Sequence, residues 1–219
     1  MNVAIAGAHG QIALRLTRLL ASDGNRVTGL IRNPDHAAEV SLAGASPVVC
    51  DLEQASVDEI ASAVDGVDAV VFAAGAGPGS GADRKLTVDR DGAIKLLRAA
   101  TNIGAGRYLM VSGSGVENPP AGDGVFEIYM RAKSEADAAV ASSDLQWTIL
   151  RPGGLTDDPG TGHVRIDHAP FSGQVPRDDV ARVLARLLRD ARSARQILYL
   201  SSGDRAIDQA LNEALESSD

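Results

Sequence analysis

The chain has 219 residues, 44% of them hydrophobic, so it can bury one sizeable core and we expect a single domain over residues 1–219. Its 29 acidic and 21 basic side chains give a formal net charge of −8, which disfavours nucleic acid and anionic membranes as partners. Cys50 is the only cysteine, which excludes an intramolecular disulfide. No charged leader and no apolar stretch of about 20 residues indicates secretion or a membrane span, so we expect a cytoplasmic protein.

Short apolar runs recur along the chain and predict six strands. They are Val3–Ala6, Val27–Ile31, Pro47–Val49, Ala69–Phe72, Tyr108–Val111 and Trp147–Leu150. Apolar residues at helical spacing lie between or after them, in the segments Ile12–Leu20, Val57–Val64, Ile94–Leu97, Tyr129–Val140 and Val180–Leu188. Apolar strands that alternate with amphipathic helices indicate a parallel sheet covered on both faces. We therefore predict an α/β fold, a doubly wound Rossmann-type sheet.

The stretch "IAGAHGQIA" (5–13) follows the first strand and begins the first helix. Gly7 allows a sharp turn, and Gly10 removes a side chain where a pyrophosphate approaches the N–H groups of a helix N-terminus. Ala13 stands where a third glycine would permit close packing of helix on strand. The alternative is a tight turn between strand and helix that binds nothing.

The ends of the second and third strands bear on the choice of cofactor. Arg32 stands where NAD-binding proteins place an acidic residue, and a guanidinium pairs with the 2′-phosphate of NADP. Asp51 follows the third strand, where a carboxylate accepts a hydrogen bond from the adenine amino group or caps a helical turn. Cys50 is interpreted as a small buried hydrophobic residue, because no basic partner stands near it in sequence.

The chain resembles the short-chain dehydrogenase/reductase superfamily, specifically its atypical NAD(P)-binding members of the NmrA-like and flavin-reductase-like kind. The matching pieces are "GAHGQIA", "CDL", "VFAAGAG", "VSGSG", "YMRAK" and "LRPGGLTDDPGTG", which cover nearly the whole chain in strand-end positions. The resemblance implies NADP(H) as cofactor, with NAD the weaker candidate. The cofactor-binding residues expected on this basis are Gly7, His9, Gly10, Gln11, Ile12, Arg32, Asp51, Leu52, Ala73, Ala74, Gly75, Ser112, Lys133, Pro152 and Gly153.

Tyr129 and Lys133 in "YMRAK" are four residues apart, so they face the same side of a helix. An ammonium group beside a phenol stabilises the phenolate, and we expect Lys133 to lower the pKa of Tyr129 so that it exchanges a proton with a substrate oxygen. In the family the lysine also bonds the nicotinamide ribose and a serine after the fifth strand holds the substrate oxygen, for which Ser114 is favoured over Ser112. The alternative is a tyrosine packed on the sheet and a solvated lysine.

The substrate region is expected within about residues 151–175, as a small pocket built from loops that takes a small carbonyl compound, a quinone or a flavin. We expect no metal, because no histidine pair has ligand spacing with a third ligand in view. The leading hypothesis is an NADP-dependent oxidoreductase in which Tyr129, Lys133 and Ser114 are catalytic. The alternatives are an NADP(H)-binding redox sensor with little turnover and a flavin or quinone reductase that transfers hydride directly. A monomer or a homodimer is expected.

Overall fold

The computed structural model describes residues 1–77 and 79–216. Its strands are β1 (Asn2–Ala6), β2 (Arg26–Ile31), β3 (Ala45–Val49), β4 (Ala69–Phe72), β5 (Arg107–Val111), β6 (Trp147–Pro152), β7 (Gly154–Thr156), β8 (His163–Asp167), β9 (Gln174–Pro176), β10 (Gln196–Ser202) and β11 (Arg205–Ala206). Its α-helices are α1 (Gln11–Ser22), α2 (Ala37–Leu42), α3 (Val57–Ala63), α4 (Ala82–Arg84), α5 (Ala93–Asn102), α6 (Val125–Ala141), α7 (Arg177–Leu187) and α8 (Ile207–Glu216). Short 3₁₀ turns are η1 (Pro34–His36) and η3 (Ala191–Ser193), and η2 (Lys85–Gly92) is a π-helix that leads into α5.

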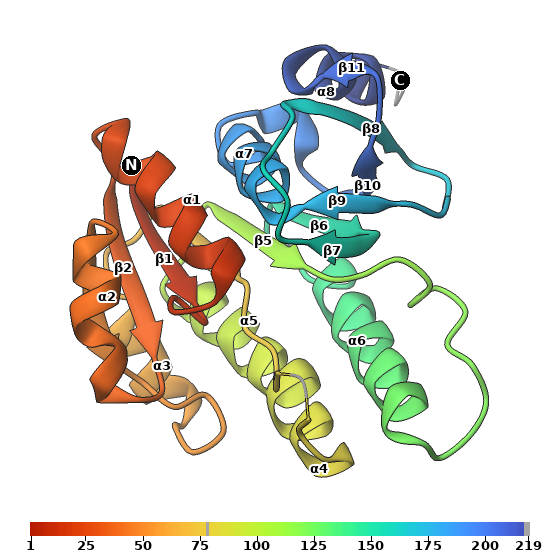
Figure 1. Cartoon of the computed structure of the whole chain (residues 1–219). Helices are drawn as coiled ribbons and strands as arrows, with labels where there is room; N and C mark the ends of the chain where they lie inside the picture. The colour runs from red at the N-terminus through yellow and green to blue at the C-terminus, as the bar shows by residue number, and fades with distance from the viewer. Residues whose placement is uncertain (78, 217–219) are drawn as a thin grey trace.

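In this part of the chain, nine strands form one sheet in the order β3-β2-β1-β4-β5-β6-β10-β8-β11, and β7 pairs separately with β9 (Figure 1). The pairs from β3 to β10 are parallel, whereas β8 runs antiparallel to β10 and β11. The prediction of an α/β doubly wound sheet is confirmed. The strand order reverses between β1 and β4, which is where ligands bind in such sheets.

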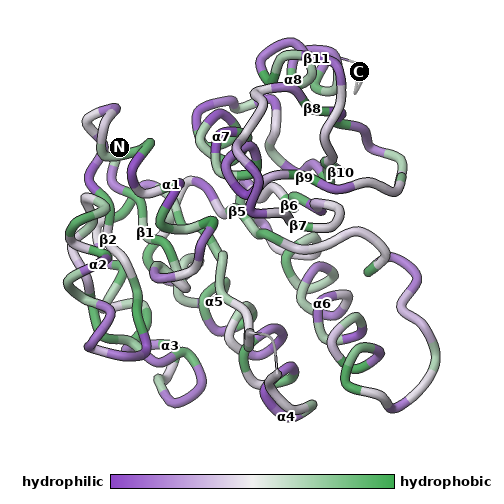
Figure 2. Tube along the Cα trace, viewed as in Figure 1, coloured by the Kyte–Doolittle hydropathy of each residue, from purple (hydrophilic) through white to green (hydrophobic). Residues whose placement is uncertain are grey.

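Alternating residues of β1 point into two separate cores, because successive side chains of a strand face opposite sides of the sheet. Val3 and Ile5 pack with apolar residues of α1, α7 and α8, whereas Ala4 and Ala6 pack with those of α3, α5 and α6. Figure 2 shows hydrophobic residues along β1 and an alternation of polar and apolar residues along α6. The helices therefore cover both faces, and the carboxyl ends of the strands are left for a ligand.

The six predicted strands and five predicted helical segments are all present, with boundaries that differ by a few residues. The apolar patterns in the sequence did not predict α2, α4, η2 or α8. They also missed the strands at the far edge of the sheet, and the segment 151–175 is not built from loops alone, because it contains β7 and β8.

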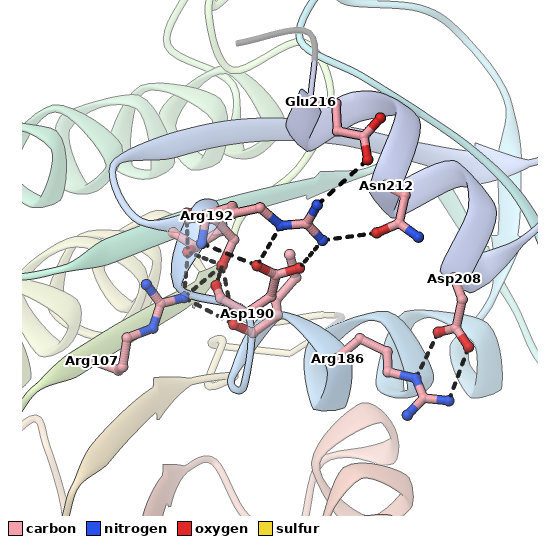
Figure 3. Close-up of polar contacts among 10 residues, drawn as sticks. Arg107, Arg186, Asp190, Arg192, Asp208, Asn212 and Glu216 are labelled. Atoms are coloured by element: carbon pink, nitrogen blue, oxygen red, sulfur yellow. Dashed lines mark hydrogen bonds and ion pairs between the residues drawn. The ribbon is translucent and has the colours of Figure 1, made fainter. Parts of the chain in front are cut away.

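The last helix, α8, is attached to α7 and to the turn η3 by polar contacts (Figure 3). Arg186 on α7 pairs with Asp208 at 2.8 Å, and Arg192 donates to Asn212 Oδ1 at 2.8 Å while also pairing with Asp190 at 2.6 Å. These contacts hold α8 beside β8 and β11, at the edge of the sheet opposite β3. Over residues 1–77 and 79–216, no helix is both long enough and apolar enough to cross a membrane.

Candidate functional site

The turn between β1 and α1 requires glycine at its first position. Gly7 has φ +76°, and a Cβ built there would lie 2.6 Å from the Cα of Ala74, which follows β4. Gly10 N–H donates to Gly7 O at 2.8 Å and Gly10 is the N-cap of α1. No side chain caps this helix and its first turn has no acidic residue. The helix N-terminus is therefore open to an anion at the point where the strand order reverses.

A cavity of about 250 Å³ opens over this turn and extends across the ends of β1, β2, β3 and β4. Nine of the predicted cofactor-binding residues line it: Gly7, His9, Gly10, Arg32, Asp51, Leu52, Ala73, Ala74 and Gly75. Gln11 and Ile12 begin α1 directly beyond Gly10, outside the lining. Segments that are far apart in sequence thus form one groove of the size expected for part of a nucleotide.

The end of the groove beyond β2 is rich in basic groups. Arg32 and His36 line it together with Arg84, which the helix α4 contributes from after β4. The Arg84 guanidinium donates to Glu53 Oε2 at 2.8 Å, and Arg32 Nη1 lies 3.5 Å from the same oxygen. Glu53 is buried enough for burial to raise its pKa, but the hydrogen bonds from Arg84 and Thr87 outweigh that effect and hold the pKa below its ordinary value.

His9 and Asp51, both predicted to bind cofactor, are held by protein groups on one side. His9 Nε2 lies 2.7 Å from Glu39 Oε2, and its ring stacks on that of His36 with centroids 3.6 Å apart. Asp51 Oδ1 accepts the N–H of Glu53 at 3.0 Å and so caps the turn that follows β3. That is the capping role weighed for Asp51.

Beyond Ala76 the wall of the groove leads to a buried group of charges. Asp89 on η2 accepts the Ala76 N–H at 3.2 Å and is 1% exposed. Lys133 on α6 is 4% exposed, and its Nζ donates to Val111 O at the end of β5 at 2.8 Å. Burial is the main cause that raises the pKa of Asp89 and lowers that of Lys133, while the attraction between the two opposes both shifts.

Tyr129 lies one helical turn before Lys133, as the spacing predicted, but its electrostatics differ from the expectation. Burial raises the pKa of Tyr129 to about 12, and the negative charges of Asp89 and Asp137 act in the same direction. The expected lowering of the pKa is wrong for this structure, because burial of the phenol and the two carboxylates raise the pKa, and the Lys133 ammonium group is directed at the Val111 carbonyl. A second ammonium, Lys85 Nζ, lies 5.2 Å from the centroid of the Tyr129 ring.

The remaining predicted residues gather at the ends of β5 and β6. Ser114 N–H donates to Pro152 O at 3.0 Å, and Gly153 N–H donates to Leu200 O at 2.9 Å. Ser112 is buried, and its hydroxyl acts on the carboxylate of Asp137, whose pKa it lowers against the larger effect of burial. These residues lie outside the lining of the groove. The predicted site residues therefore form two groups. One lines the groove at the ends of β1 to β4, and the other lies at the ends of β5 and β6, the next strands of the sheet.

A buried ion pair joins the elements next to the residues at the ends of β5 and β6. Arg151 donates from Nε to Asp137 Oδ2 at 2.9 Å and from Nη1 to the Tyr199 hydroxyl at 2.6 Å. Glu117, in the segment after β5, lies 3.5 Å from the same guanidinium. These contacts link β6, α6 and β10. In the described ranges, no group of three or more histidine, cysteine, aspartate or glutamate side chains is arranged to hold a metal ion.

The glycine turn, the groove and the buried lysine together define a Rossmann-type dinucleotide-binding protein. Residues 7–191 match the model of the NAD(P)H-binding family, so this chain belongs to that family. An uncharacterized sugar epimerase of Bacillus subtilis is 37% identical over 97% of this chain and 100% of its own length. The predicted membership of the atypical short-chain dehydrogenase/reductases is confirmed, while the NmrA-like assignment stays a prediction.

Two solved structures are similar over nearly their whole length. One, from Bacillus halodurans and provisionally assigned as an NAD-dependent epimerase/dehydratase, has a TM-score of 0.90 and 34% identity over 97% of this chain and 99% of its own. The other, an oxidoreductase of Lactococcus lactis, has a TM-score of 0.86 and 27% identity over 99% of this chain and 97% of its own.

Sequence reasoning missed Glu53, Arg84, Asp89 and Asp137. Glu53 stands two residues after Asp51, so its place at the end of β3 is readable from the sequence. Arg84 and Asp89 belong to α4 and η2, for which the polar segment 82–92 gives no helical pattern. Asp137 lies four residues after Lys133 on the same helix face, which is a usable signal for a charge partner.

Proposed function

We propose that this protein is an NAD(P)H-dependent oxidoreductase that reduces a small carbonyl, quinone or flavin substrate and prefers NADP(H). Membership of the NAD(P)H-binding family supports the cofactor class. The Lactococcus relative, named as an oxidoreductase, supports the reaction class. The residues of this chain support the individual roles.

The groove fits a dinucleotide at two points. A side chain at Gly7 would collide with the backbone after β4, and the uncapped N-terminus of α1 offers N–H groups to a pyrophosphate. Arg32 lines the groove next to β2, with 54% of its side chain exposed, and is available to a 2′-phosphate. A bound nicotinamide cofactor supplies the hydride.

One observation carries the proposal: Asp89 links the wall of the groove to the proton-transfer residues. Its carboxylate accepts the Ala76 N–H, and its charge acts on both Lys133 and Tyr129. A structural tyrosine and a solvated lysine would not require a buried carboxylate between them and a nucleotide groove. Strongly shifted pKa values beside a cleft are typical of a catalytic site.

Tyr129 is the proposed proton donor. With a pKa of about 12 the phenol stays protonated at neutral pH, so Tyr129 can give a proton to an oxygen that becomes negative during reduction. An alkoxide is a stronger base than this phenolate, so the transfer is downhill. Ser114 would orient the substrate oxygen, and Lys133 would hold the cofactor ribose after release from Val111 O.

A second function, direct hydride transfer to a flavin or a quinone, is favoured by the environment of Lys133. Its ammonium group is engaged by Val111 O and does not lower the pKa of Tyr129. A substrate that needs no coupled protonation by the protein would leave Tyr129 dispensable. The two functions therefore differ in their dependence on one hydroxyl group.

The test is NADPH oxidation with a panel of aldehydes, ketones, quinones and flavins, for the native protein and Tyr129→Phe. Loss of about 100-fold or more in the variant with a carbonyl substrate supports the proton-donor role. Turnover of flavin or quinone that survives the substitution supports direct hydride transfer. Tight NADPH binding without any turnover would overturn both and favour a redox sensor.

Tyr108→Phe is the matched control for this experiment. It removes the same atom from a buried tyrosine whose hydroxyl donates to Ala93 O at 3.1 Å on α5, away from the groove. We expect this variant to be less stable but to keep the native rate per folded molecule. An equal loss of rate in both variants would mean that Tyr129 acts through stability alone.

A further inference from the structure

The adenosine end of the groove contains two arginines that meet on one carboxylate. Arg32 follows β2, Glu53 follows β3 and Arg84 lies on α4, so two strand ends and one helix contribute to the cluster. Glu53 Oε2 accepts from Arg84 Nη2 at 2.8 Å and Nε at 3.2 Å, and it lies 3.5 Å from Arg32 Nη1. Its other oxygen accepts the Thr87 hydroxyl at 2.6 Å. Both guanidinium groups are thereby held at the lining of one cavity.

Within the cluster of Arg32, Arg84 and Glu53, the positive charges outnumber the negative charges by one. Two guanidinium groups share one carboxylate, and the side chain of that carboxylate is only 15% exposed and satisfied by three residues. The side chains of Arg32 and Arg84 are 54% and 36% exposed, so each keeps N–H groups on the solvent side. Asp51, the other carboxylate of the lining, is engaged through one oxygen by the Glu53 N–H.

The position of the cluster in the sheet determines which part of a bound dinucleotide lies next to it. The glycine turn and the N-terminus of α1 follow β1, and β2 lies on the side of β1 opposite to β4 and Lys133. A pyrophosphate at the turn therefore places the adenosine ribose next to Arg32 and the nicotinamide toward β4. A phosphomonoester on the adenosine ribose is the anion that this cluster meets.

We propose that Arg84 is a second specificity-determining residue, which together with Arg32 binds the 2′-phosphate of NADP, while Glu53 positions both guanidinium groups. The inference rests on the proposed preference for NADP(H). It adds Arg84, which does not stand at the end of β2 where the sequence pattern places Arg32. Arg84 contacts Glu53 through two of its nitrogens, so it is fixed before ligand binding. Arg32, at the longer distance of 3.5 Å, is the arginine that moves toward the phosphate.

The experiment measures binding of 2′,5′-ADP and 5′-AMP by calorimetry, because these two ligands differ only in the 2′-phosphate. In the native protein we expect 2′,5′-ADP to bind at least about tenfold more tightly. Arg84→Gln should weaken 2′,5′-ADP by about 10- to 100-fold and change 5′-AMP by less than about threefold. Arg84→Lys, which keeps the charge but loses the planar fork, should fall between the two.

Arg26→Gln is the matched control, because Arg26 is an exposed arginine at the opposite end of β2. It makes the same change in net charge, so any loss common to Arg26→Gln and Arg84→Gln is a long-range effect of charge. Thermal unfolding of each variant without ligand reports whether the substitution affects the fold. Raising the salt concentration should weaken 2′,5′-ADP more than 5′-AMP in the native protein.

The outcomes separate the inference from the proposed function. An equal loss of both ligands in Arg84→Gln would overturn the role in phosphate binding and make Arg84 a support of the adenosine pocket. Equal affinity of the native protein for the two ligands would overturn both the binding of the 2′-phosphate by Arg32 and Arg84 and the NADP preference, with Glu53 then available to ribose hydroxyls as in NAD binding. Failure to bind either nucleotide, or NADPH, would overturn the proposed function itself.

Discussion

Gly7→Ala tests whether the first turn is held by a close approach of two strand ends or only by its backbone conformation. Gly7 has φ +76°, and Gly24, at the end of α1, has φ +77°. A Cβ at Gly24 would meet nothing within 4 Å, whereas at Gly7 it would lie 2.6 Å from Ala74 Cα. The two substitutions therefore carry the same cost of left-handed backbone, about 1–2 kcal/mol. Only Gly7→Ala adds a clash, of about 1–3 kcal/mol.

The assay is urea unfolding of the native protein and both variants, followed by circular dichroism. We expect Gly24→Ala to lower the free energy of unfolding by about 1–2 kcal/mol and Gly7→Ala to lower it by about 2–5 kcal/mol. The difference between the variants measures the contact of the turn with Ala74. Equal losses would refute the argument, because the turn would then absorb a methyl group without moving the chain after β4.

Three further predictions concern buried charge and helix capping. The raised pKa of Asp89 means that its ionised form costs stability, so relative to Asp89→Asn the native protein should lose unfolding free energy as pH rises from about 4 towards 7; parallel curves in urea titrations would contradict this. The native-minus-Tyr129→Phe difference in tyrosinate absorbance should show a step near pH 12, and a step near the ordinary value of 10.0 would contradict the burial argument. Ser56 caps α3 and accepts the Glu59 N–H at 3.2 Å, so Ser56→Ala should cost about 1 kcal/mol in urea unfolding; Ser62→Ala, in the same helix, is the control and should stay within about 0.5 kcal/mol.

The centre of the fold could be predicted because each parallel strand is buried on both faces. The runs at Val3–Ala6 and Ala69–Phe72 are apolar without interruption, and both strands lie in the middle of the sheet. The far edge could not be predicted in the same way. β8 is antiparallel, with polar residues at His163, Arg165 and Asp167, and its pairing with β10 and β11 defines it as a strand.

The helix that carries Arg84 and Asp89 is the main omission, and its cause is physical. Residues 82–92 are mostly polar, and a π-helix has a period that an analysis for 3.6 residues per turn does not detect. Its stability comes from packing, since η2 lies against α6 and α5. The residues that link the groove to Tyr129 are therefore fixed by tertiary contacts, which a local pattern does not contain.

The spacing of Tyr129 and Lys133 predicts that their side chains share one face of a helix, but it does not predict the pKa of Tyr129. Four residues of helix place the two side chains on one face, which the structure reproduces. The sign of the pKa shift depends on which effect is larger, attraction by the ammonium group or loss of water. Loss of water is the larger effect at Tyr129, and Asp89 and Asp137 add repulsion, while the Lys133 ammonium group is directed at Val111 O. Asp89 and Asp137 act towards a higher pKa on both Lys133 and Tyr129, and the Tyr129 phenol is therefore protonated at neutral pH, as a proton donor in a reduction must be.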